Sequence, residues 1–114
     1  MANQRDVRKI ALSLPKTTED PNGFRFLVKG KQFVWVWLER VQPKKARVPN
    51  PEVIAVRVAD DLDKQVLLAS DRVVFFTEPH YDGYPAVLVR LSKIDRVRLK
   101  EVLTNAWRCR ALGG

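Results

Sequence analysis

The spacing of apolar residues along the chain predicts three helices. The first covers Gln4–Leu14, with Asn3 as a suitable N-cap and Pro15 directly after its last residue. The second covers Asp60–Ser70 and has acidic residues in its first turn, which suit the positive end of the helix dipole. The third begins at Asp95, a good N-cap, and runs to about Arg110.

Apolar and β-branched runs between these helices predict five strands. The strands cover Phe24–Val28, Gln32–Glu39, Val53–Val58, Val73–Thr77 and Ala86–Leu91. A short turn with Gly30 at its centre joins the first two strands. Trp35 and Trp37 share one face of the second strand, and apolar residues also fill its other face, so this strand is expected in the middle of a sheet. The segment Gln42–Pro51 has three prolines and three basic residues, which predicts a long exposed loop.

The order of these elements, α-β-β-β-α-β-β-α, predicts an α+β fold. We expect a single compact domain over residues 1–114, with a mainly antiparallel sheet of about five strands covered on one side by three helices. The chain has no βαβαβ alternation and no glycine-rich turn between a strand and a helix. A Rossmann or P-loop nucleotide site is therefore not expected.

Composition excludes several other classes of protein. At 46% hydrophobic residues the chain is globular rather than disordered. The single Cys109 cannot form an intramolecular disulfide, and no Cys/His cluster offers metal ligands, so we expect no cofactor and no metal. The sequence has no apolar run of about 20 residues and no signal-peptide pattern at its N-terminus, so we expect a cytoplasmic protein without a membrane partner.

Charge makes polyanions the first partners to consider. The chain has 21 Lys and Arg against 13 Asp and Glu, a net charge of +8. Basic residues without nearby acids gather at the first hairpin and in the proline-rich loop, where they could reach phosphates: Arg25, Lys29, Lys31, Lys44, Lys45 and Arg47. The alternative is that these side chains are simply solvated and keep the protein soluble. The basic residues of the last helix point in several directions, which is typical of a solvated helix.

The segment Glu78–Pro85 is the most site-like stretch of the chain. It contains His80, the only histidine, together with Tyr81 and Tyr84, between two strands. A catalytic role for His80 needs a nucleophile beside it, which the sequence does not identify, so we favour a structural or binding role and do not expect an enzyme. The turn either presents its rings to a ligand or packs them on the sheet. Trp35 and Trp37 are interpreted as core residues.

Three stretches resemble the MmcQ/YjbR-like family of small bacterial proteins. They are Ala11-Leu-Ser-Leu-Pro-Lys-Thr-Thr-Glu19, the block from Phe75 to Leu91 that contains Glu78-Pro-His-Tyr-Asp-Gly-Tyr-Pro85, and Ala106-Trp107 in the last helix. The resemblance implies a compact domain similar to a double-wing module of a phage transcription factor, and the family is commonly labelled DNA-binding by this analogy of fold. It implies no catalytic residues. Many relatives have a tryptophan after the turn that follows the histidine, whereas this chain continues Asp82-Gly-Tyr-Pro-Ala.

Two functions follow as hypotheses. The first is a non-catalytic DNA-binding protein, in which basic residues contact phosphates and the aromatic turn lies against sugars or bases; its candidate site is Arg25, Lys29, Lys31, Lys44, Lys45, Arg47, His80, Tyr81 and Tyr84. The alternative is a domain that binds a small ligand or a protein, with the aromatic turn forming the wall of a pocket against Trp35 or Trp37. A concave aromatic pocket that contains His80 would be the signature of this alternative.

Overall fold

The three helices begin at the caps that the sequence predicts. In the computed structural model, which describes residues 2–39 and 45–112, the side chains of Asn3, Asp60 and Asp95 each accept a hydrogen bond from a backbone N–H in the first turn. These caps satisfy donors that a helix leaves unpaired at its N-terminus. The helices are α1 (Gln4–Ser13), α2 (Asp61–Ser70) and α3 (Arg96–Ala111), with two short 3-10 helices, η1 (Pro79–Tyr81) and η2 (Leu91–Lys93).

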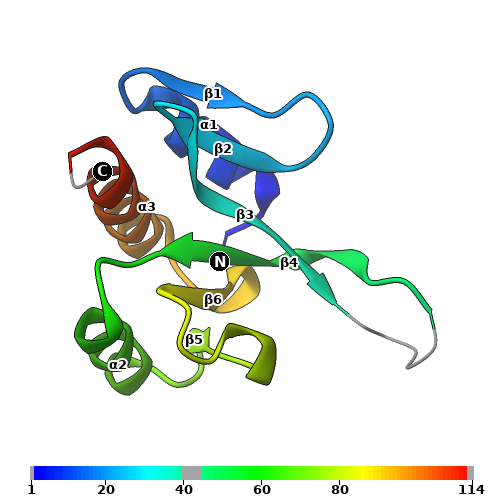
Figure 1. Cartoon of the computed structure of the whole chain (residues 1–114), viewed down its shortest axis with the longest axis vertical. Helices are drawn as coiled ribbons and strands as arrows, with labels where there is room; N and C mark the ends of the chain where they lie inside the picture. Colours follow the sequence, from blue (N-terminus) through cyan, green and yellow to red (C-terminus); the bar gives the residue numbers. More distant parts are fainter. Residues whose placement is uncertain (1, 40–44, 113–114) are drawn as a thin grey trace.

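The strands form one antiparallel sheet in the order β1-β2-β3-β4-β6-β5 (Figure 1). They are β1 (Thr17–Glu19), β2 (Arg25–Val28), β3 (Lys31–Glu39), β4 (Val48–Arg57), β5 (Phe75–Phe76) and β6 (Ala86–Arg90). This sheet confirms the predicted α+β fold and the predicted order of its elements. The described residues contain one strand more than expected, because β1 is three residues long, too short to show an alternating pattern.

Strand β4 begins earlier than the sequence indicates. Residues 48–50 were expected in an exposed loop but pair with β3 in an antiparallel ladder that includes Leu38 and Pro49. The pairing of β4 with β6 begins only at Val53, so the first part of β4 has no second neighbouring strand. Proline, which lacks an N–H donor, is tolerated where one side of a strand is unpaired. The β3–β4 hairpin therefore extends beyond the rest of the sheet (Figure 1).

One face of the sheet packs on the helices and forms the main core. Val7 of α1 and Leu103 of α3 are fully buried against strand residues such as Phe26 and Val87. Burial of apolar surface of this kind is the main stabilising contribution to a domain of this size. The helices thus cover one side of the sheet, as predicted.

In the described part of the chain, none of the three α-helices contributes to the small core on the opposite face of the sheet. Val53, Ala55 and Leu88 are buried there beneath a layer of partly buried aromatic residues: Trp35, Trp37, Phe76 and Tyr81. The two tryptophans share this face, as the alternation along β3 predicts. The segment between β5 and β6 covers the face, so the aromatic turn lies directly on the sheet.

Candidate functional site

A buried lysine fixes the aromatic turn against α2. Lys64 is only 3% exposed, and its Nζ donates hydrogen bonds to the backbone carbonyls of Tyr81, at 2.6 Å, and Tyr84, at 2.9 Å. A buried ammonium group requires such partners, because an unpaired buried charge is strongly destabilising. The two bonds hold the backbone of the turn at two points, three residues apart.

The side chain of Tyr81 is fixed from the other direction. Its hydroxyl accepts a hydrogen bond from Trp35 Nε1 at 3.1 Å. Burial raises the pKa of the Tyr81 hydroxyl above its ordinary value of 10.0 because it disfavours the phenolate; the Trp35 hydrogen bond partly opposes this, and the Glu78 carboxylate adds to it. The rings of His80 and Tyr84 lie 5.9 and 6.0 Å from the Tyr81 ring, measured between centroids. Three rings of the turn therefore gather beside Trp35.

These rings form one side of a cavity of about 460 Å³ on the sheet face opposite the α-helices. Its walls include Trp35, His80 and Tyr81, together with Phe24 and Leu38. A smaller adjoining cavity of about 230 Å³ shares the same side chains and adds Tyr84. We call the two cavities together the aromatic groove. Four polar residues also line it: Asn22, Arg25, Gln32 and Arg47.

Two arginines line the aromatic groove from different hairpins. Arg25 is the first residue of β2, and its Nε lies 3.2 Å from an oxygen of Asp20. Arg47 directly precedes β4, and its Nη1 donates to the carbonyl of Leu38 at 3.0 Å. A guanidinium group has five N–H donors, so each arginine keeps donors beyond the contact that orients it. The groove thus combines aromatic walls with two positive charges.

The structure brings together five of the nine residues predicted for the site. Arg25, Arg47, His80 and Tyr81 line the larger cavity of the aromatic groove, and Tyr84 lines the smaller one. This arrangement also has the concave aromatic pocket around His80 that the alternative hypothesis requires. Both hypotheses therefore lead to the same place on the molecule.

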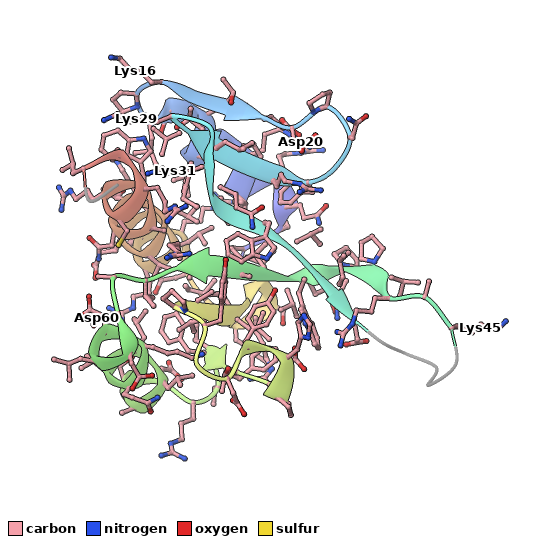
Figure 2. The ribbon with its side chains drawn as sticks, viewed as in Figure 1. Lys16, Asp20, Lys29, Lys31, Lys45 and Asp60 are labelled. Carbon is pink, nitrogen blue, oxygen red and sulfur yellow. The ribbon has the colours of Figure 1, made fainter. Side chains whose placement is uncertain are left out.

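The remaining predicted residues lie away from the aromatic groove. Lys29 Nζ donates to the carbonyl of Ala111 at the end of α3, at 2.7 Å, and Lys31 lies at the same end of the sheet (Figure 2). Lys45 lies at the far end of the β3–β4 hairpin (Figure 2). Lys44 falls outside the described residues. The predicted basic residues therefore occupy at least three separate parts of the molecule.

Sequence reasoning identified only some of the residues that build the groove. Trp35 was interpreted as core, although the alternative hypothesis placed it or Trp37 at a pocket wall, and it lines both cavities. Gln32 also lines both, and its place beside Trp35 on β3 gives no signal without the fold. Lys64 had no signal either, since a lysine in a short helix is ordinarily solvated.

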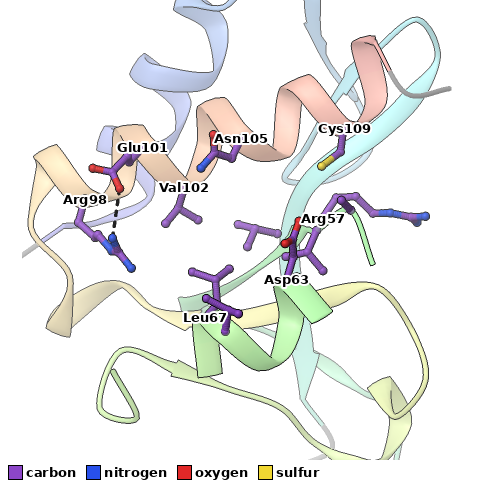
Figure 3. A pocket seen from close by; sticks show the side chains of 12 residues that line it. Arg57, Asp63, Leu67, Arg98, Glu101, Val102, Asn105 and Cys109 are labelled. Atoms are coloured by element: carbon purple, nitrogen blue, oxygen red, sulfur yellow. Dashed lines mark hydrogen bonds and ion pairs between the residues drawn. The ribbon is translucent and has the colours of Figure 1, made fainter. Parts of the chain in front are cut away.

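A second cavity, of about 450 Å³, lies between α2 and α3 (Figure 3). Among the described residues, none of the nine predicted ones lines it. Two carboxylates, Asp63 and Glu101, line it together with two arginines, and Arg98 is paired with Glu101 at 3.1 Å. Cys109 opens onto this cavity, and burial, followed by the nearby Asp63 carboxylate, raises the pKa of its thiol. Because five of the nine predicted residues line the aromatic groove and none lines this cavity, we place the candidate site in the groove.

Three further observations apply to the described residues. In residues 2–39 and 45–112, no group of three or more His, Cys, Asp or Glu side chains could hold a metal ion. Within the same ranges, no side chain donates a hydrogen bond to His80 or accepts one from it. No helix of the described chain has the length and apolar character needed to cross a membrane.

Comparisons with known proteins agree with the resemblance noted in the sequence. The family model described as YjbR matches residues 12–109. Three proteins described only as uncharacterized, Rv2570 and MT2646 of Mycobacterium tuberculosis and Mb2600 of Mycobacterium bovis, are each 40% identical over 114 aligned residues, 94% of this chain and 87% of theirs. No solved structure gave a significant match. The extent of the family match, together with these relatives, shows that the chain belongs to the YjbR family.

Proposed function

We propose that the protein is a non-catalytic DNA-binding protein and that DNA contacts it at the aromatic groove. The observation that carries this proposal is the meeting of Arg25 and Arg47, from two different hairpins, at a cavity walled by Trp35, His80 and Tyr81. Cationic groups beside exposed ring faces are the combination that proteins use to hold a nucleic-acid strand, because arginine contacts phosphates and aromatic rings contact bases.

Charge on the whole molecule supports the same proposal. A net charge of +8 attracts a polyanion from a distance and increases the rate of encounter, although it does not select a site. The described residues that line the larger cavity of the aromatic groove include Arg25 and Arg47 and no acidic residue, whereas Asp63 and Glu101 line the α2–α3 cavity beside its two arginines. Phosphate contacts are therefore expected at the groove rather than between α2 and α3.

The test is the salt dependence of DNA binding, followed by fluorescence anisotropy of labelled oligodeoxynucleotides. The logarithm of the affinity should fall linearly with the logarithm of salt concentration, with a slope of about −0.7 to −0.9 for each phosphate contact. Arg25→Ala and Arg47→Ala should each weaken binding and reduce the slope by about one contact. Arg108→Ala is the matched control, because Arg108 is an exposed arginine of α3 and its loss changes the net charge equally.

Two results would contradict the proposal. One is the absence of DNA binding at low salt by the wild-type protein. The other is an equal effect of Arg25→Ala, Arg47→Ala and Arg108→Ala, which would show that only total charge matters. Circular dichroism of each variant separates loss of binding from loss of folding, since Arg25→Ala also removes the ion pair with Asp20.

Binding of a small anionic ligand is the second candidate function. The observation that favours it is the size of the larger cavity, about 460 Å³, which lies within the range of about 300–1,000 Å³ typical of small-molecule sites. The two arginines would then bind the anionic group of the ligand. Isothermal titration with a free deoxynucleoside monophosphate separates the two candidates, because a small-ligand site should bind it as tightly as an oligonucleotide.

A further inference from the structure

We infer that the aromatic groove accepts an unpaired DNA base, so that the protein prefers single-stranded DNA to duplex DNA. This inference rests on the proposed function and names the form of DNA that the groove fits. It depends on four features of the groove: its concave shape, its pre-positioned rings, its free amide groups and the place of its arginines.

The shape of the groove suits a nucleotide taken out of a base stack. The larger cavity is a hollow of about 460 Å³ whose walls include aromatic rings and apolar side chains. In a duplex, proteins reach only the edges of the bases along the grooves, while the faces remain stacked inside. A base can contact ring faces in a hollow only when it is unpaired or turned out of the helix, and turning it out of a duplex costs a few kcal/mol. A single strand avoids this cost.

The rings are held in place before any ligand arrives. Trp35 Nε1 bonds to the Tyr81 hydroxyl, and Lys64 bonds to the backbone of the turn at Tyr81 and Tyr84. Ring positions fixed in advance reduce the conformational entropy lost on binding. His80 is exposed and has no hydrogen-bond partner among the described residues, so its ring is available to stack on a base.

Two side-chain amides can recognise the polar edge of such a base. Gln32 lines both cavities of the aromatic groove, and Asn22 lines the larger one. In the described part of the chain, neither amide makes a side-chain hydrogen bond. An amide offers both a donor and an acceptor, which matches the mixed donors and acceptors on the edge of a base. The side-chain amides of Asn22 and Gln32 are therefore free to form hydrogen bonds with a ligand in the groove.

The arginines are placed for the backbone of the same strand. Arg25 and Arg47 lie on the wall of the cavity that holds the rings, so a base in the cavity would have its phosphates within their reach. The lysines that a wing-like contact with a duplex would use, Lys29, Lys31 and Lys45, lie at opposite ends of the molecule (Figure 2). None of these three lysines lines the groove, and Lys29 is bonded to the carbonyl of Ala111.

The experiment compares three probes by anisotropy or competition: a single-stranded oligodeoxynucleotide, the same sequence as a duplex, and a free deoxynucleoside monophosphate. We expect the single strand to bind at least about tenfold more tightly than the duplex. A duplex must either unpair a base or forgo one base–aromatic stack, and each costs about that factor or more in affinity. His80→Ala should weaken single-strand binding about five- to tenfold and weaken duplex binding by a smaller factor, whereas His80→Phe should restore single-strand binding because a ring face returns.

Gln32→Ala should weaken single-strand binding less than His80→Ala does and should change the preference among the four bases. Equal affinity for single strand and duplex, with no effect of His80→Ala, would overturn the inference while leaving DNA binding intact. Binding of the free nucleotide as tight as that of the oligonucleotide would overturn it in favour of a small-ligand site. Failure of both DNA forms to bind would overturn the inference and the proposed function together.

Discussion

Lys64 Nζ lies 2.6 Å from the carbonyl oxygen of Tyr81. Lys64 belongs to α2, whereas Tyr81 belongs to the aromatic turn between β5 and β6. The lysine is 3% exposed and bonds also to the carbonyl of Tyr84. Helix α2 therefore determines where the aromatic turn lies, although α2 has no part in the aromatic groove itself. This relationship leads to the first prediction.

Lys64→Met should lower the free energy of unfolding by about 1–3 kcal/mol. The methionine side chain fills similar space, but the carbonyls of Tyr81 and Tyr84 each lose one hydrogen bond. Each carbonyl keeps a backbone partner, since Tyr84 N donates to Tyr81 O and Ala86 N donates to Tyr84 O. The protein should therefore still fold. Urea denaturation measures the change, and Gln65→Met, at the neighbouring exposed position of α2, is the control. A loss no larger than that of Gln65→Met would show that the lysine does not hold the turn.

Tyr81→Phe and Tyr84→Phe should differ in their effect on stability. The first removes the acceptor of Trp35 Nε1 and leaves a partly buried donor unpaired, which costs about 1 kcal/mol. The second removes only a long contact of 3.4 Å from Arg57, at an exposed position, and should change stability by no more than about 0.5 kcal/mol. Denaturation of the two variants side by side checks this order. The reverse order would contradict the assigned role of Tyr81.

Stability should fall at alkaline pH through Tyr81. Its pKa in the folded protein lies above 10.0 because burial disfavours the phenolate, so the folded state keeps this proton when the unfolded chain has already lost it. The unfolded state then binds fewer protons, and the free energy of unfolding decreases as the pH rises from about 10 towards the folded pKa. Denaturation from pH 8 to pH 11 should show a steeper loss in wild type than in Tyr81→Phe. Parallel curves would count against the raised pKa.

Lys29 should matter for stability rather than for DNA. Its Nζ donates to Ala111 O, one of the carbonyls left unpaired at the C-terminus of α3, where a positive charge is also favourable. We expect Lys29→Met to lower the free energy of unfolding by about 0.5–1.5 kcal/mol. DNA affinity should change no more than for Arg108→Ala. A loss of affinity as large as that of Arg47→Ala would place Lys29 in the binding surface.

Local patterns explain why the elements of the fold could be predicted. The caps Asn3, Asp60 and Asp95 act on neighbouring residues in the chain, so the sequence is sufficient to locate the helices. Strand β1 and the first residues of β4 could not be predicted in the same way. Thr17–Glu19 forms a strand through its pairing with β2, and Val48–Pro51 through its pairing with β3, although the prolines in the second segment indicate a loop.

The candidate site was only partly predictable for a similar reason. The rings of Tyr81 and Tyr84 stand out because they lie close together in sequence, in a turn that also contains His80. The convergence of Arg25 and Arg47 depends on how the strands are arranged in the sheet, and Lys29, which belongs to the same basic group in sequence, bonds to the end of α3. A count of basic residues along the chain cannot separate these side chains, because it does not show which way each side chain points in the folded protein.

Mapping the surface that DNA contacts tests the central claim most directly. Two-dimensional ¹H–¹⁵N NMR spectra of the protein, titrated with a single-stranded oligodeoxynucleotide, report shifts of each backbone amide and of the Trp35 indole N–H. We predict that the largest shifts fall on Arg25, Gln32, Arg47 and residues 80–84, and that Asn105 and Cys109 in the α2–α3 cavity stay unchanged. Shifts concentrated around Asn105 and Cys109, or no shifts at all, would contradict the account.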